Sequence, residues 1–340
     1  MNINRIVIVG LGSMGKKHLN FARFHCPRAI IKVLTKYPFN DPERSANGYL
    51  QNISEAIAFK PQLIIIANPA SLHLQTASKM AKLDAFMLIE KPLSNNLEHI
   101  ENLIEIFKKF KTKLLIGYNL RFNPSLSYFR EIYKKGVIGK IFSVRAEVGQ
   151  YLPDWRNEIE YKKSVSANKS LGGGVLLELS HELDYLIWMF GRPLWVIASV
   201  SKSSDLEIDT EDQAMMIFEH EDMSSGKKFQ TSLNLDFFRQ DTTRRCTLIG
   251  EKGSLRWDGV LGVVEKFDNL GKQWIKEFSD HDSGNKSYYF EWRHFIDCAQ
   301  GRDTSQITFQ NGVDVLSLIE AVTLSNSKGK QILINYKDVD

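Results

Sequence analysis

Lys91 is the residue of this sequence best placed to do chemistry. It directly follows a buried apolar run, and it stands between Glu90 and Pro92. Because proline restricts the backbone of the residue before it, the lysine is held at the end of a predicted strand. A lysine ammonium held there can donate a hydrogen bond to a hydroxyl or carbonyl oxygen of a substrate. The alternative interpretation is a surface lysine at a strand end.

A second group of polar residues lies in an apolar helical segment that follows three glycines at 172–174. Glu178, His181 and Asp184 recur at intervals of three, so a helix places them along one side, with Trp188 at a wider angle. A histidine and two carboxylates are costly to bury unless they pair or face a cleft. Histidine suits acid-base chemistry near neutral pH, and a carboxylate beside it can fix its tautomer. A core histidine satisfied by a neighbouring carboxylate is equally compatible with the pattern.

A third group has the side chains of a substrate site. Arg121 follows a predicted strand, whereas Trp155, Arg156, Lys162 and Lys163 lie in an irregular stretch. Arginine pairs with carboxylate or phosphate through two parallel hydrogen bonds, and aromatic rings can pack against sugar faces. These residues suit an anionic or sugar-like ligand. For the Trp155 group, a solvated loop would look similar.

A glycine turn near the start of the chain predicts a dinucleotide site. The apolar run Ile6 to Val9 reads as a buried parallel strand, and the segment 16–25 after the turn reads as a helix. Between them, the first glycine permits a tight turn, the second lets backbone approach a pyrophosphate, and the third allows close packing of helix on strand. Phosphates then lie at the helix N-terminus. The turn residues expected at the cofactor are Gly10, Gly12, Ser13, Met14 and Gly15.

The periodicity of apolar residues predicts the strands and helices that position these residues. Buried runs alternate with amphipathic helices up to about residue 118, which is the pattern of a doubly wound parallel sheet. We predict Ser54, Ser71 and Ser94 as helix starts. In such sheets ligands bind outside the carboxyl ends of the strands. The polar groups that follow the predicted strands are 10–15, Thr35-Lys36, Asn68-Pro69, Glu90 to Pro92 and Asn119 to Arg121.

Beyond Asn123-Pro124 the pattern changes. One helix is predicted over 175–190, and most of the segments between 195 and 278 read as successive strands with turns between them. Such a succession predicts a largely antiparallel sheet in an α+β domain. We therefore predict an α/β protein with a Rossmann domain at 1–120 and an α+β domain at 121–340.

Composition narrows the classes of function. The 340 residues carry 44 Lys and Arg against 40 Asp and Glu, and the resulting +4 is spread along the chain, which gives nucleic-acid binding little support. The three cysteines, Cys26, Cys246 and Cys298, are far apart, which favours reduced thiols in the cytoplasm and no metal site. We expect neither a signal peptide nor a run of ~18 apolar residues that would span a membrane.

Together these segments resemble the Gfo/Idh/MocA family (glucose-fructose oxidoreductase and inositol dehydrogenase). The segments that carry the resemblance are GLGSMG at Gly10, EKP at Glu90, NLRFNP at Asn119, the helix after Gly172 and IGEKGS at Ile249. The resemblance implies a Rossmann domain and a C-terminal domain whose open sheet forms homo-oligomers, dimers or tetramers. It also implies oxidation or reduction of sugars, sugar phosphates or nucleotide sugars with NAD or NADP.

Residue roles follow from the resemblance by position. Lys91 would be the catalytic lysine, His181 the acid-base residue, and Asp184 its partner or a substrate ligand. The residues implied near the cofactor are Asn68, His73, Glu90 and Asn119. Many members carry an aspartate four residues before the histidine, where this chain has Leu177, so Glu178 is the nearest acid and a candidate for substrate binding along with Arg121, Trp155 and Arg156.

The cofactor is less well defined than its site. Many members that prefer NAD end the second strand with an acidic residue, but Thr35 and Lys36 stand here. A hydroxyl and a cation suit a 2′-phosphate, which favours NADP. Asp41 or Glu43 could instead serve NAD.

Three functions are therefore compared. The first is a cytoplasmic NAD(P)-dependent sugar oxidoreductase, and the segment Gly149 to Arg156 is similar to a branch of the family in bacterial surface-sugar biosynthesis. The second is a non-catalytic dinucleotide or sugar sensor on the same fold, against which the presence of both Lys91 and His181 argues. Nucleic-acid binding is the third, and the charge pattern does not favour it.

Overall fold

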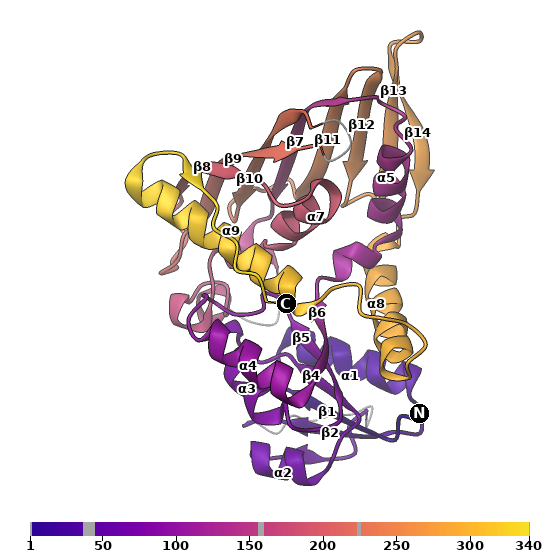
Figure 1. Cartoon of the computed structure of the whole chain (residues 1–340), viewed down its shortest axis with the longest axis vertical. Helices are drawn as coiled ribbons and strands as arrows, with labels where there is room; N and C mark the ends of the chain where they lie inside the picture. Colours follow the sequence, from indigo (N-terminus) through magenta and orange to yellow (C-terminus); the bar gives the residue numbers. More distant parts are fainter. Residues whose placement is uncertain (1, 37–44, 156–159, 223–225, 340) are drawn as a thin grey trace. The chain divides into compact units, whose positions relative to one another are not determined.

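The computed structural model describes residues 2–36, 45–155, 160–222 and 226–339 (Figure 1). The chain forms two compact units, and each is described by itself. The first unit comprises Met1–Tyr118, Tyr289–Leu316 and Asp338–Asp340, and the second comprises Asn119–Tyr288 and Ser317–Lys337. Two long helices, α8 (Ser283–Ala299) and α9 (Phe309–Lys328), contribute residues to both units. No helix within the described ranges is both long and apolar enough to cross a membrane.

The first unit is built on a parallel sheet in the order β3-β2-β1-β4-β5-β6. Its strands are β1 (Arg5–Val9), β2 (Ile30–Leu34), β3 (Tyr49–Leu50), β4 (Leu63–Ile66), β5 (Phe86–Glu90) and β6 (Lys113–Gly117). All neighbours pair in parallel, which confirms the predicted doubly wound sheet. Chain order reverses between β1 and β4, so the topological switch point, where ligands bind in such sheets, lies where Gly10 and Asn68 follow these strands.

Helices of the first unit begin at different residues from those predicted. They are α1 (Ser13–His25), α2 (Ile53–Ala58), the 3₁₀ turn η1 (Ala70–Leu72), α3 (His73–Met80) and α4 (Ile100–Phe110). Asn52, not Ser54, caps α2, because its side chain accepts the Glu55 N–H at 3.0 Å. Ser71 lies inside η1, and α4 begins after Ser94 by six residues, because His99 adopts a left-handed φ of 59°.

The second unit is built on a nine-stranded sheet in the order β14-β13-β12-β11-β7-β10-β9-β8-β15. Its strands are β7 (Ile141–Gly149), β8 (Trp195–Ser201), β9 (Gln213–Glu221), β10 (Lys228–Asp236), β11 (Thr243–Gly250), β12 (Gly253–Asp258), β13 (Val263–Asp268), β14 (Gln273–Ser279) and β15 (Ile332–Leu333). Among these described strands β7 and β10 pair in parallel, and the other pairs are antiparallel. The predicted largely antiparallel sheet is therefore confirmed.

Helices cover one face of this sheet, and within the described part of the unit the other face is open. Helix α5 (Pro124–Lys134) packs on β12 to β14, and α6 (Val175–Glu178) packs on β9 and β10, whereas α7 (His181–Phe190) lies along the same face in Figure 1. The remaining short helices of the unit are η2 (Asn119–Phe122), η3 (Leu152–Asp154), η4 (Tyr161–Lys163) and η5 (Lys169–Leu171). Side chains alternate along the strands, so the inward set, such as Val144 and Leu248, is buried.

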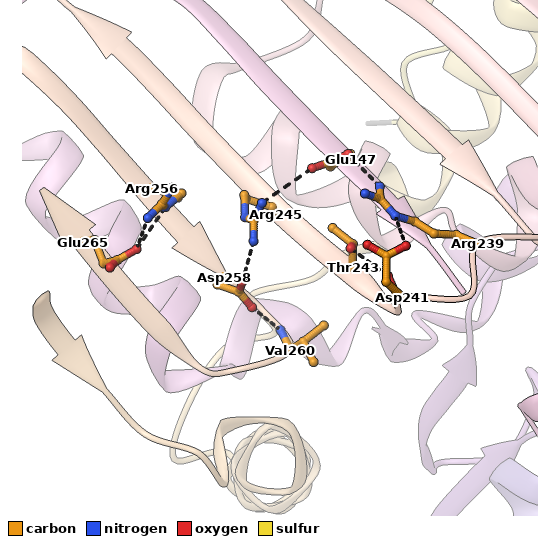
Figure 2. A network of polar contacts seen from close by, with 9 residues as sticks. All are labelled: Glu147, Arg239, Asp241, Thr243, Arg245, Arg256, Asp258, Val260 and Glu265. Carbon is orange, nitrogen blue, oxygen red and sulfur yellow. Dashed lines mark hydrogen bonds and ion pairs between the residues drawn. The ribbon is translucent and has the colours of Figure 1, made fainter. Parts of the chain in front are cut away.

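The open face is polar at its β7 to β13 end and apolar at its β8 and β9 end. Figure 2 shows the polar end, where Arg239 Nη1 lies 2.8 Å from Glu147 Oε2 and Arg256 Nη2 lies 2.7 Å from Glu265 Oε2. At the apolar end Ile197, directly opposite Ile217 in the pairing, is 41% exposed, and Ile217 is 40% exposed. Exposed apolar residues in a row are unusual on a solvated sheet face.

His220 is a buried titratable group in the second unit. It is 1% exposed, its ring stacks on Phe229 with centroids 5.5 Å apart, and its Nδ1 lies 3.1 Å from Gly191 O. Since a carbonyl oxygen only accepts, the proton of the neutral ring is on Nδ1. Burial lowers the pKa of His220 from 6.5 to about 4, because the charged ring loses its hydration.

This depressed pKa predicts an acid-labile fold. Between pH 6.5 and pH 4 the unfolded chain takes up a proton at position 220 that the folded chain does not, so the free energy of unfolding falls by about 3 kcal/mol from this group. His220→Asn keeps an N–H donor but does not titrate, so its urea midpoint should fall less between pH 7 and pH 4. The exposed His281→Asn is the control. An unchanged pH dependence in His220→Asn would contradict the assignment.

Candidate active site

The turn after β1 forms an open cradle at the N-terminus of α1. Gly10 has φ +91°, and a Cβ there would lie 2.6 Å from Ala67 O, whereas a Cβ at Gly15 would lie 2.2 Å from Gly10 O. At Gly12 an added Cβ would meet no atom of the described residues within 4 Å. The first turn of α1 contains no acidic residue, and no side chain caps it. An uncapped helix N-terminus with room beside Gly12 suits a phosphate.

The described residues at the end of β2 are a hydroxyl and a cation. Thr35 is half-buried and its N–H donates to Leu50 O at 3.4 Å, whereas Lys36 is exposed. Asp41 and Glu43, the alternative residues for NAD, lie outside the described residues.

Asn68 and His73 connect the ends of β4 and β5. Asn68 Nδ2 donates to Thr76 Oγ1 at 3.0 Å, and its buried Oδ1 has no hydrogen-bond partner in the described part of the chain. The two ring nitrogens of His73 lie 2.7 Å from Asn68 O and 2.9 Å from Pro92 O. Burial lowers the pKa of His73, against the opposite effect of these carbonyl oxygens. A neutral ring has one N–H and donates to one of them.

Glu90 and Lys91 end β5 side by side. Glu90 is 5% exposed, its Oε2 accepts the Lys91 N–H at 3.1 Å, and its Oε1 lies 2.6 Å from His18 Nε2. Burial acts to raise the pKa of Glu90, but the His18 hydrogen bond and nearby cations outweigh it, so the pKa is lowered. Glu90 is therefore ionised at neutral pH. Lys91 itself is half-exposed.

In the second unit, Arg121 and Asp184 form a buried ion pair. Arg121 Nε donates to Asp184 Oδ2 at 2.9 Å and Nη2 to Oδ1 at 2.7 Å, and the side chains are 5% and 0% exposed. The Arg121 guanidinium also lies over the Trp188 ring, 5.8 Å from its centroid. The carboxylate predicted to orient His181 is thus bound by an arginine through two parallel hydrogen bonds.

Glu178 and His181 lie on two helices rather than on one. Helix α6 ends at Glu178 and α7 begins at His181, so the predicted continuous helix is wrong at this point. Between them the Ser180 N–H bonds to Leu177 O, three residues back, which tightens the turn. Both Glu178 and His181 are half-exposed, whereas Asp184 is buried.

Asn119 and Trp155 use their polar groups within the second unit. Asn119 is buried and its Nδ2 donates to Ser287 Oγ at 2.6 Å. Trp155 is half-buried and its Nε1 donates to Gln150 O at 3.2 Å. Arg156, the other predicted substrate residue of this segment, lies outside the described residues.

Two family models match the chain over most of its length. The model "Oxidoreductase family, NAD-binding Rossmann fold" matches residues 4–118, and the model "GFO/IDH/MocA C-terminal domain" matches residues 127–256. The chain belongs to the Gfo/Idh/MocA family of oxidoreductases. The resemblance seen in the sequence is therefore confirmed.

Individual family members are similar to this chain at low identity. The rhizopine catabolism protein MocA of Rhizobium meliloti is 25% identical over 194 residues, 55% of this chain and 57% of MocA. Levoglucosan dehydrogenase of Pseudarthrobacter phenanthrenivorans is 27% identical over 206 residues, 56% of this chain and 52% of that enzyme. These alignments span about half the length of the curated relatives.

Solved structures show the family fold over the whole chain. The WlbA dehydrogenase from Bordetella pertussis, in complex with NADH and UDP-GlcNAcA, superposes with a TM-score of 0.81 at 20% identity. The superposition covers 98% of this chain and 100% of WlbA. The fold of the Gfo/Idh/MocA family is thereby shown for both units.

The first unit fits the dinucleotide of the family. The open cradle at Gly12 and the uncapped helix end suit a pyrophosphate, and the orphan Oδ1 of Asn68 is a buried acceptor near the same edge of the sheet. In the described residues no group of three or more His, Cys, Asp or Glu is arranged to hold a metal ion.

Several buried polar residues were not singled out from the sequence. In the first unit they include His18, Glu291 and Trp292, and in the second unit they include Glu182, whose Oε1 accepts from Arg244 Nε at 2.7 Å. Glu182 could have been found, because it is a carboxylate in an apolar helix. Its partner, 62 residues away, has no local pattern.

Removing one partner of the Arg121–Asp184 pair should destabilise the second unit. Asp184→Ala leaves a buried guanidinium without its counter-charge, which we expect to lower the free energy of unfolding by about 3–5 kcal/mol in urea denaturation. The double variant Arg121→Met with Asp184→Leu removes both charges, so its free energy of unfolding should fall less than that of the single variant. Glu131→Ala, which breaks the exposed pair with Lys135, is the control. A single variant as stable as the wild type would contradict the account.

Proposed function

We propose that this protein is an NAD(P)-dependent oxidoreductase of a sugar, a sugar phosphate or a nucleotide sugar. One observation carries the proposal: the glycine cradle at α1 and Lys91 after β5 lie at the same carboxyl edge of one parallel sheet. Membership of an NAD-binding oxidoreductase family supports it.

In this proposal two side chains act on the substrate. When bound, the nicotinamide exchanges a hydride with a carbinol or carbonyl carbon of the sugar. Lys91 donates a hydrogen bond to the substrate oxygen and stabilises the charge that develops on it. His181 takes or returns the proton of that oxygen. Asp184 acts as the partner of His181 or as a substrate ligand while Arg121 holds its carboxylate.

Other residues hold the two ligands. The residues proposed at the cofactor are Gly10, Gly12, Ser13, Met14, Gly15, Thr35, Lys36, Asn68, His73, Glu90 and Asn119. For the substrate we propose Arg121, Trp155, Arg156 and Glu178. Nε and Nη2 of Arg121 donate hydrogen bonds to Asp184. Nη1 is therefore the nitrogen that we propose for the substrate.

We propose NADP as the cofactor because of the two residues that follow β2. Thr35 and Lys36 suit a 2′-phosphate, and no carboxylate stands at these two positions. WlbA, which shares the fold, was solved with NADH and a UDP-sugar, so NAD is the alternative and a nucleotide sugar is a candidate substrate. We propose that the protein acts in bacterial surface-sugar biosynthesis, because the segment Gly149 to Arg156 is similar to that branch of the family. A cytoplasmic location fits the three buried free thiols.

Lys91→Met tests the catalytic proposal. The wild type is first titrated with NADPH and NADH by fluorescence, where NADPH should bind more tightly, and is then assayed at 340 nm on inositols, anhydrosugars and UDP-sugars. Lys91→Met should lower kcat by about 100-fold or more, because the developing charge loses its donor. Its cofactor Kd should stay within about threefold.

The exposed Lys82→Met in the same unit is the control and should keep wild-type kcat. Wild-type turnover in Lys91→Met would overturn the role of this lysine. A wild type that binds cofactor but turns over no sugar would instead favour the sensor.

We also propose that the open face of the nine-stranded sheet forms a homo-oligomer. Ile197, Met215 and Ile217 gather on this face at 41%, 51% and 40% exposure, next to charges of both signs that can pair with a second copy. Ile217→Lys should therefore shift the mass measured by light scattering to that of the 39.0 kDa chain. Leu270→Lys, at a 94% exposed position in a turn, should not. An unchanged mass in Ile217→Lys would exclude this face.

A further inference from the structure

A chain of hydrogen bonds leads from α8 through α1 to the backbone of Lys91, all within the first unit. Trp292 Nε1 donates to His18 Nδ1 at 2.9 Å, and His18 Nε2 lies 2.6 Å from Glu90 Oε1. The other oxygen of Glu90 accepts the N–H of Lys91 at 3.1 Å. Trp292 and His18 are both fully buried. Three separate segments of sequence thus converge on one carboxylate.

The indole of Trp292 fixes the tautomer of His18. An indole N–H only donates, so His18 Nδ1 must be the acceptor and carries no proton. The proton of the imidazole is then on Nε2, which donates to Glu90 Oε1. The contact is therefore a directed hydrogen bond from a neutral ring to a carboxylate. Without the indole, Nδ1 would lose the donor that makes it an acceptor.

Backbone packing restricts the Glu90 carboxylate from the other side. β6 pairs with β5, and a Cβ on Gly117 would lie 3.2 Å from Glu90 Cδ and 3.3 Å from Oε1. Any larger residue at 117 would press on the carboxylate. Glu90 therefore has little freedom between β6 and His18.

The surrounding charges leave the negative charge on Glu90. The ammonium groups of Lys17 and Lys91 favour its ionised form, and Glu291 is the other buried carboxyl group nearby. Glu291 is fully buried, and neither of its oxygens has a hydrogen-bond partner among the residues described. Burial and the charge of Glu90 raise the pKa of Glu291 well above its ordinary value, so of these two carboxyl groups Glu90 is the one that ionises first.

We propose that His18 and Trp292 are positioning residues for Lys91. His18 and Trp292 hold the Glu90 carboxylate in one orientation. The carboxylate in turn accepts the backbone N–H of Lys91, the first residue after β5. The proposal rests on the proposed function, in which the Lys91 ammonium meets a substrate oxygen. Since a displacement of about 1 Å in an active site can cost 100-fold in rate, the effect on catalysis should be measurable.

Trp292→Phe keeps the aromatic ring and removes only the donor nitrogen. His18→Leu removes the donor to Glu90, and His18→Gln supplies an amide N–H in its place. We expect Trp292→Phe and His18→Leu to lower kcat by about tenfold with the cofactor Kd within about twofold, and His18→Gln to recover most of kcat. The control is Trp257→Phe, which removes a buried indole bond to Ser125 Oγ, also 2.9 Å, in the second unit.

A second readout does not need turnover. Hydrogen exchange at the Lys91 amide should be about tenfold faster in Trp292→Phe than in the wild type, and nitrogen NMR of His18 should show Nδ1 unprotonated in the wild type only. If the wild type turns over sugars but kcat and amide exchange are unchanged in the variants, the positioning role is overturned. If the wild type turns over no sugar, the proposed function fails, and amide exchange alone still decides whether His18 and Trp292 fix Lys91.

Discussion

A buried carboxylate that stays ionised needs hydrogen-bond donors in place of water, and the first unit is arranged around that requirement at Glu90. One oxygen is bonded by His18 from α1 and the other by the amide of Lys91. Helix α1 therefore has to lie beside β5, and Gly117 on β6 has to lack a side chain. The same helix begins with the glycine cradle, so the phosphate site and the lysine are fixed by one set of contacts.

In the second unit, arginines provide the counter-charges of two buried carboxylates. Asp184 is bonded by Arg121 and Glu182 by Arg244, so both buried carboxylates of α7 are neutralised. Among the polar side chains that the sequence predicts on this segment, Glu178 and His181 remain half-exposed. The buried pairs hold the helix, and the half-exposed Glu178 and His181 are proposed to meet a substrate together with Nη1 of Arg121.

Local patterns in the sequence were sufficient for most of the fold. Apolar runs such as Leu63 to Ile66 predict buried strands, and the spacing of Gly10 and Gly15 predicts the turn, because both depend on neighbouring residues. Helix starts were less certain, since Ser54 and Asn52 are both good caps and only the bond to Glu55 decides between them. The break between α6 and α7 contains no glycine or proline, so the sequence could not predict it.

Hydrogen-bonded pairs of residues that are far apart in the chain could not be predicted from the sequence. Arg121 and Asp184 were each singled out, but their pairing across 63 residues was not, and Trp292 bonds to His18 across 274 residues. Such contacts depend on how whole elements pack. They explain why the position of Lys91 could be predicted while the residues that hold it could not.

Transfer of deuterium from sugar to cofactor would show hydride transfer itself. Sugars and UDP-sugars deuterated on carbon are incubated with oxidised cofactor, and the reduced cofactor is analysed by mass spectrometry. With at least one substrate, each nicotinamide should gain one deuterium. Cofactor that binds to the protein but never gains deuterium would contradict the proposed hydride transfer.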